Sequence, residues 1–234
     1  MIKEISRLVC VGLMGLVLVG CSSEQGTGTN TPKLVLDSLS QVIAARRAGP
    51  PQKLELTAAQ LAEIDQPLLQ INPELLGGSS FLGRATTRRD SGLGTVEVWN
   101  STDNARVFLR NGVIIGTRGV GGDMISADAN VTIKALSAGA DRSGVRTYVV
   151  SDGDVTTTEY RFQCKLDVIG QERITIVNQT FNTNYIREDC VGGVRGDAVL
   201  RNEYWVQPST GLVRKSRQWI GPRVGYFEVV LVKN

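Results

Sequence analysis

The pattern of apolar and polar positions changes near residue 78, and beyond it the chain alternates with the period of two that a β-strand requires. The segment TVEVWNS, with Val96 and Val98 on one face, is an example. In ARVFLRNGVIIGT, Asn111 and Gly112 separate two apolar runs, and this pair is typical of a type I′ hairpin turn because both positions need a positive φ. Further strands are predicted at 145–151, 155–168, 173–181, 198–206, 212–220 and 224–232.

Tight connections between these strands are predicted at Gly153 and Gly170. No long helical pattern interrupts the series, so a parallel sheet with crossover helices is not expected. The pattern predicts an all-β fold, with one large antiparallel sheet curled into a half-barrel or open barrel.

Two short helices are predicted ahead of the strands. The segment 33–49, KLVLDSLSQVIAARRAG, has apolar residues at helical spacing and two arginines in its last turn, and two prolines follow it. The second helix is predicted to start at Thr57, where TAAQ has the form of a capping box with Gln60 reaching back to the cap, and to end before Pro67.

The N-terminal segment has the pattern of a secretory signal. Two cations, Lys3 and Arg7, precede the apolar run 8–20, which is short for a membrane-spanning helix. The residues Leu-Val-Gly before Cys21 resemble the lipobox of bacterial lipoproteins, in which the peptidase cuts before the cysteine and its sulfur is acylated. By that resemblance, residues 1–20 are a signal peptide and Cys21 receives acyl chains such as palmitate, a stable membrane anchor.

The residue after the acylated cysteine bears on the destination of a lipoprotein. Here it is Ser22, where lipoproteins that remain in the inner membrane typically have Asp, so we expect outer-membrane attachment on the periplasmic side. The polar stretch 21–32 is interpreted as a flexible tether, and 33–234 as a single β-rich domain.

The charge balance excludes one class of partner. Without residues 1–20 the chain has 24 Lys and Arg against 22 Asp and Glu. A net charge of +2 gives no large basic field, so nucleic acid is not an expected partner.

The cysteines are consistent with an oxidising compartment. Cys10 lies in the signal and Cys21 in the lipobox, which leaves Cys164 and Cys190. We predict that these two form a disulfide across neighbouring strands, which stabilises the fold by about 3–4 kcal/mol in the chain-entropy estimate. A redox pair or a metal site is the alternative, but the spacing is not CxxC and the chain has no histidine to complete a zinc shell.

Catalytic motifs are mostly excluded, because a chain without histidine contains no Ser-His-Asp triad and no Cys-His pair. The segment 119–124, GVGGDM, lacks the Gly-Lys-Ser/Thr ending of a phosphate loop, and 151–154, SDGD, lacks EF-hand spacing; both are interpreted as connections. A glycosidase needs only two carboxylates, and nothing in the sequence brings any two of the candidates together: Glu159, Glu188, Asp189 and Glu203.

The C-terminal segment YWVQPSTGLVRKSRQWIG resembles the C-terminal hairpin of the YjbF/GfcB family, lipoproteins linked with exopolysaccharide and group 4 capsule production. The matching residues are Trp205, Val206, Thr210, Gly211, Val213, Arg214, Ser216, Arg217 and Gln218. A second similarity is RNGVIIGTRGV, at Asn111, Gly112, Thr117, Gly119 and Val120. The chain departs from the family at Val113, where a basic residue is commoner, and its cysteine pair is not a feature of all family members. The resemblance implies no catalytic residues and no cofactor.

The same segment raises a binding hypothesis. In a regular strand Lys215, Arg217 and Trp219 share one face, and Arg214, Ser216, Gln218 and Ile220 share the other, so at least one face must be solvated or line a polar groove. A solvated face is one interpretation. In the other, Arg214 or Arg217 holds an acidic polysaccharide and Trp205 or Trp219 stacks on a sugar ring.

Three functions follow from these observations. The resemblance favours a non-enzymatic outer-membrane lipoprotein that supports polysaccharide assembly or export by binding glycan or a protein of the export machinery. A half-barrel with an apolar cavity would instead suit a lipid or lipoprotein carrier. A glycan-processing enzyme would need two carboxylates about 5–10 Å apart in a cleft.

Overall fold

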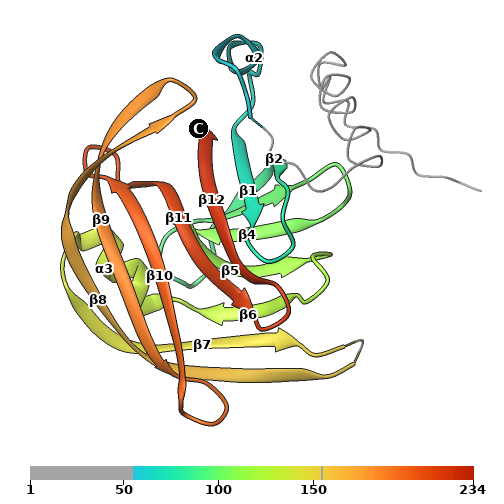
Figure 1. The fold of residues 1–234 in the computed structure, drawn as a ribbon, viewed down its shortest axis with the longest axis vertical. Helices are drawn as coiled ribbons and strands as arrows, with labels where there is room; N and C mark the ends of the chain where they lie inside the picture. Colours follow the sequence, from blue (N-terminus) through green and yellow to red (C-terminus); the bar gives the residue numbers. More distant parts are fainter. Residues whose placement is uncertain (1–54, 154) are drawn as a thin grey trace, which may run out of the picture.

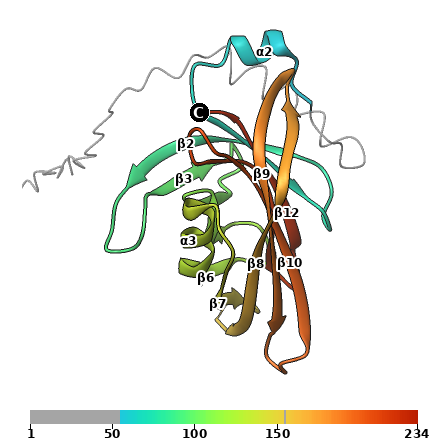
Figure 2. The same cartoon turned by 90° about the vertical axis from the view of Figure 1, so that its left-hand side faces the viewer.

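Twelve strands form one antiparallel sheet in the computed structural model, which describes residues 55–153 and 155–234. The sheet curls until it is nearly closed into a barrel (Figures 1 and 2), as the sequence pattern predicts. The predicted signal, the lipobox, the tether and the predicted helix at 33–49 lie outside the described residues. Within the described part of the chain, no helix has the length and apolar character needed to cross a bilayer.

Neighbouring strands in the sheet are also consecutive in the sequence, with one exception, the pair of β1 and β12. The order runs β5-β4-β3-β2-β1-β12-β11-β10-β9-β8-β7-β6, so β1 pairs with β12, and β5 and β6 are the two edges. The bounds of the first six strands are β1 Leu68–Pro73, β2 Ser80–Arg88, β3 Val96–Asn100, β4 Arg106–Arg110, β5 Val113–Arg118 and β6 Met124–Asp128. The remaining six are β7 Arg142–Ser151, β8 Thr157–Ile176, β9 Gln179–Gly192, β10 Ala198–Gln207, β11 Leu212–Gly221 and β12 Gly225–Lys233.

Two short helices accompany the sheet. Helix α2, Ala58–Ala62, begins with the predicted capping box, in which Thr57 and Gln60 each bond the other's backbone N–H. Helix α3, Asn130–Ala138, was not predicted, because Val131, Ile133 and Ala135 alternate like a strand. It packs inside the curled sheet against buried residues of β8 to β11 (Figure 2). Gly139 ends it in the left-handed conformation at φ 57°.

The hairpin prediction at Asn111-Gly112 is confirmed, with φ values of 48° and 80°. The predicted break at Gly170 is wrong. Strand β8 continues through Gly170, where a β-bulge shifts the register with β9, and the turn comes at Val177 and Asn178 with φ values of 44° and 65°. The predicted strand 173–181 therefore spans a turn, and most of β9 was missed because valine is rare at positive φ.

The two open edges are connected by the glycine-rich segment 119–124, as predicted. Asp123 accepts hydrogen bonds from the backbone N–H groups of Gly119 and Val120 at 2.9 and 3.1 Å. Arg118 of β5 donates to the carbonyl of Met124 in β6 at 3.2 Å. The backbone N–H groups of Gly119 and Val120 therefore donate to a carboxylate of the chain itself.

The core lies on the concave side of the sheet. One cluster joins both halves of the sheet, with Trp99 and Leu109 from β3 and β4 and Phe162 and Cys164 from β8. A second cluster packs α3 against β5 and β8 to β11. These two clusters fill much of the interior and position the buried polar groups described next.

Candidate functional site

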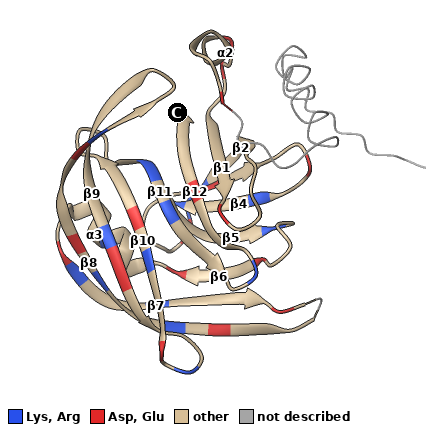
Figure 3. Ribbon diagram, in the orientation of Figure 1, with Lys and Arg blue, Asp and Glu red and all other residues tan. Residues whose placement is uncertain are grey.

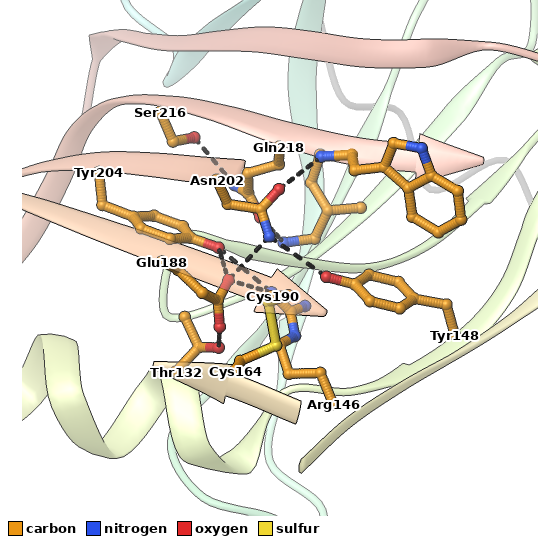
Figure 4. Close-up of polar contacts among 12 residues, drawn as sticks. Thr132, Arg146, Tyr148, Cys164, Glu188, Cys190, Asn202, Tyr204, Ser216 and Gln218 are labelled. Atoms are coloured by element: carbon orange, nitrogen blue, oxygen red, sulfur yellow. Dashed lines mark hydrogen bonds and ion pairs between the residues drawn. A yellow bond between two sulfur atoms is a disulfide. The ribbon is translucent and has the colours of Figure 1, made fainter. Parts of the chain in front are cut away.

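The concave face holds a buried ion pair between Arg146 of β7 and Glu188 of β9. Their side chains are 1% and 0% exposed, and Nη1 of Arg146 lies 2.8 Å from Oε2 of Glu188 (Figure 4). They face the interior because strand alternation puts both on the same side as Cys164 and Cys190. A buried charge is costly unless it is paired, so each of these two side chains depends on the other, across the intervening strand β8.

Neutral side chains complete the coordination of Glu188. Its Oε2 also accepts from Asn202 at 2.7 Å and from the Tyr204 hydroxyl at 3.2 Å, and its Oε1 accepts from Thr132 of α3 at 2.5 Å. Burial raises the pKa of Tyr204 well above its ordinary value, and the Glu188 carboxylate adds to this. Tyr204 therefore stays protonated as a donor to the carboxylate.

Arg146 remains charged in this site. Burial works to lower its pKa, but the Glu188 carboxylate together with Tyr148 and Tyr204 outweighs burial, and the net shift is upward. The guanidinium lies 4.7 Å from the ring centroid of Tyr148. Among the described residues, its Nε is buried without a hydrogen-bond partner. The network therefore stabilises charge in the interior, and both oxygens of its carboxylate accept hydrogen bonds from donors of the chain.

The disulfide lies beside this network. Cys164 and Cys190 face each other across β8 and β9 with Cα atoms 4.0 Å apart, as predicted for neighbouring strands. Both sulfurs lie near Glu188, but the bonded cysteines are not free thiolates, so this cluster is not a metal site.

The candidate carboxylates for hydrolysis are divided between surfaces. Glu188 faces the interior, while Asp189 faces outward and accepts from Arg187 at 2.8 Å and Arg201 at 2.6 Å. Burial would raise the pKa of Asp189, but these two hydrogen bonds outweigh it and lower that pKa. Glu203 accepts from the Tyr185 hydroxyl, and Glu159 is exposed. The four therefore do not form a two-carboxylate cleft.

The cations of the C-terminal motif lie among charges of both signs on β8 to β11 (Figure 3), and each has a partner. Arg217 makes a bidentate pair with Glu74 at 2.6 and 2.7 Å and stacks over Tyr226 at 3.6 Å. Lys215 pairs with Glu228 at 2.8 Å. Arg214 donates to Gln207 at 2.7 Å, and burial lowers its pKa.

The two tryptophans of the motif have different environments. Trp205 stacks on Tyr185 with ring centroids 5.1 Å apart, and its indole N–H donates to Glu172 at 2.9 Å. Trp219 packs edge-on against Tyr148 and Phe162, whose side chains belong to the core.

The division of faces predicted for β11 holds for Ser216, Gln218 and Ile220, which are all buried, but not for Arg214 and Trp219. A register shift between β10 and β11 leaves Arg214 without a paired residue, and a second shift follows Trp219. Trp219 contacts the core instead of sharing a surface with Arg217, and Ser216 and Gln218 are buried. The four residues proposed for one glycan groove, Trp205, Arg214, Arg217 and Trp219, have separate partners, and their role in binding stays a prediction.

The two motifs that suggested the family resemblance meet in space, which the sequence could not reveal. The side-chain amide of Gln218 accepts from the N–H of Ile114 and donates to the carbonyl of Gly112, both at 2.9 Å. Val213 packs directly over Gly112, where a Cβ atom would lie 2.5 Å from the valine side chain. The C-terminal hairpin thus holds the Asn111-Gly112 hairpin across the interior.

Beside this contact is a cavity of about 540 Å³, which opens between the two hairpins and the end of α3. A second cavity, of about 350 Å³, is mostly apolar and is lined by residues such as Ile71, Leu82 and Phe227. None of the four candidate carboxylates lines either cavity.

Comparison with known proteins agrees with this geometry. Residues 36–232 match the sequence profile described as "Group 4 capsule polysaccharide lipoprotein gfcB, YjbF". The chain belongs to this family. A solved structure of similar fold is the hypothetical lipoprotein YmcC from Escherichia coli (K12), with a TM-score of 0.65 at 18% identity over 84% of this chain and 95% of that one. No curated protein sequence is significantly similar to the chain. Family membership makes it a membrane-anchored lipoprotein associated with capsule polysaccharide.

Proposed function

We propose that the protein is an outer-membrane lipoprotein that faces the periplasm and supports exopolysaccharide or capsule assembly or export, without catalysing a reaction. In this proposal Cys21 is the acylated anchor, and the domain binds glycan or a protein of the export machinery. The observation that supports it most is the family match, which extends over residues 36–232 and so includes both structural motifs.

The geometry supports binding over hydrolysis. The one buried candidate carboxylate, Glu188, is hydrogen-bonded by donors of the chain, and Asp189 next to it lies on the opposite face. A glycosidase would need two such groups on either side of one bond. A lipid carrier would need a cavity lined by apolar side chains throughout, and the lining of the larger of the two cavities described above includes the ion pair of Arg84 and Glu97, which weighs against it.

Export of polysaccharide by the source bacterium tests the proposal. The gene is deleted and complemented with the intact chain, with Cys21→Ser, which removes the acylation site, and with Ser22→Asp, which directs a lipoprotein to remain in the inner membrane. We expect export to fall in the deletion and to be restored only by the intact chain. Membrane fractionation shows where each variant resides.

Each other outcome rejects a defined part of the proposal. Unchanged export in the deletion would reject the role in polysaccharide export. Restoration by Ser22→Asp would reject the need for the outer membrane, and restoration by Cys21→Ser would reject the need for the anchor.

A further inference from the structure

The cavity of about 540 Å³ lies within the range of about 300–1,000 Å³ typical of small-molecule sites. Its floor is formed by interior side chains of the sheet, among them Leu69, Trp99 and Leu231. Its exposed rim includes Ser137 near the end of α3 and Thr210 in the turn between β10 and β11. An apolar floor with a polar, accessible rim is the form of a ligand pocket rather than of a packing defect.

Both sequence motifs contribute to the wall of this cavity. The lining residues that belong to them are Asn111, Gly112, Thr210, Gly211, Val213 and Ser216. Gln218, which bonds Gly112 and also donates to Ser216 at 2.8 Å, holds the two parts of this wall together. Residues a hundred positions apart in the sequence are thus assembled around one space.

The charged side chains of the lining cancel. Among the described residues that line it, Arg84 has the one cationic side chain and Glu97 the one anionic side chain, and they pair at 3.0 Å with side chains 29% and 24% exposed. The lining therefore offers no uncompensated cation to an anionic sugar, which distinguishes this cavity from the arginine groove considered above.

The polar groups nevertheless offer both donors and acceptors. Within the described residues, the Arg84 side chain makes two hydrogen bonds, and Nη1 donates both. One goes to Glu97 and the other to the amide oxygen of Asn234 at 3.5 Å. The other nitrogens of Arg84 are left for a ligand, and Ser137 and Thr210 add hydroxyl groups at the rim. A sugar has hydroxyl groups on its edges and C–H groups on its faces, which matches polar walls around an apolar floor.

We propose that this cavity binds a short, uncharged, hydroxyl-rich segment of glycan. The Arg84–Glu97 pair hydrogen-bonds sugar hydroxyls as donor and acceptor, and the apolar floor covers the C–H face of the ring. The inference rests on the glycan-binding part of the proposed function and gives it a site and a ligand class.

Direct binding tests the inference. Oligosaccharides are released from the exported polysaccharide of the source bacterium by partial hydrolysis and separated by anion exchange into a neutral and an acidic fraction. Binding of each fraction to the full acylated chain in detergent is measured by isothermal titration calorimetry. We expect the neutral fraction to bind.

Two substitutions of equal size on α3 locate the site. Ser137→Trp places a large ring in the rim of the cavity, whereas Ala138→Trp places the same ring at the next exposed position, which does not line it. We expect Ser137→Trp to weaken binding about tenfold or more and Ala138→Trp to leave it unchanged. Glu97→Gln, which removes the charge and keeps the shape, should also weaken it.

The alternative outcomes separate this inference from the proposed function. If both tryptophan variants still bound the neutral fraction, the cavity would be rejected as the binding site, but glycan binding by the protein would stand. Binding of the acidic fraction, lost in Ser137→Trp, would reject the ligand class. If neither fraction binds, the inference fails, and the export assay alone decides whether the protein acts through a protein partner.

Discussion

Glu188 is the side chain on which most of the interior polar groups depend. It is fully buried, and it links α3 through Thr132, β7 through Arg146 and β10 through Asn202 and Tyr204. Asn202 in turn accepts from the backbone N–H of Trp219 at 2.8 Å and so extends the network to β11. One carboxylate therefore connects four strands and a helix.

Removal of this charge should strongly destabilise the folded protein. Glu188→Gln leaves Arg146 buried without its counter-ion, and we expect the free energy of unfolding to fall by about 3–5 kcal/mol. Urea denaturation measures the change. The double variant Arg146→Met with Glu188→Leu removes both charges and should be less destabilised than Glu188→Gln. A loss below about 1 kcal/mol for Glu188→Gln would contradict a structural role for the pair.

At the scale of elements, the sequence predicted what local chemistry determines. The Asn111-Gly112 turn and the Thr57 capping box depend on neighbouring residues only, and both are confirmed. The turn at Val177-Asn178 was missed because the paired strands impose positive φ on a valine. Helix α3 was missed because its alternating apolar residues are buried between β5 and β8 to β11, a tertiary arrangement that overrides the local pattern.

The contact between the two hairpins can be tested by a matched pair of glycine substitutions. Gly112 and Gly211 have similar φ values of 80° and 71°, but only a Cβ at Gly112 would meet another side chain, that of Val213. Gly211→Ala should lower the free energy of unfolding by about 1–2 kcal/mol, from backbone strain alone. Gly112→Ala should lower it by about 1–3 kcal/mol more, because the new Cβ atom overlaps the side chain of Val213.

Chemical denaturation of both variants measures this difference. If both variants lost the same free energy of unfolding, the close packing of Val213 against Gly112 would not be required for stability. The pair thus separates the conformational requirement of a turn from the packing requirement of the hairpin contact.

At the scale of the whole molecule, the sheet is held closed by contacts that no local pattern specifies. Gln218 joins β11 to the β4–β5 hairpin, and Arg118 joins the two edge strands. The sequence identified the motif residues, but not that they surround one cavity or that Arg84 and Glu97 complete it. Those relations depend on the curvature of the sheet, which no local pattern specifies.

The disulfide stabilises the whole domain because it restricts the conformations that the unfolded chain can adopt. Its cysteines are 26 positions apart, and the chain-entropy estimate gives about 3–4 kcal/mol for a loop of this length. The double variant Cys164→Ala with Cys190→Ala should lose about this amount in urea denaturation. Reductant should destabilise the native protein similarly and leave the double variant unchanged; a loss under about 1 kcal/mol in either experiment would contradict the estimate.

The pairing of β1 with β12 bears on the order in which the protein is assembled. Strand β1, the first strand of the described residues, lies between β2 and β12, so one of its edges remains unpaired until the C-terminal end of the domain has been synthesised. Such long-range pairing is slow to form. The five strands before the β5–β6 connection therefore cannot complete their part of the sheet until the C-terminal strand has been synthesised.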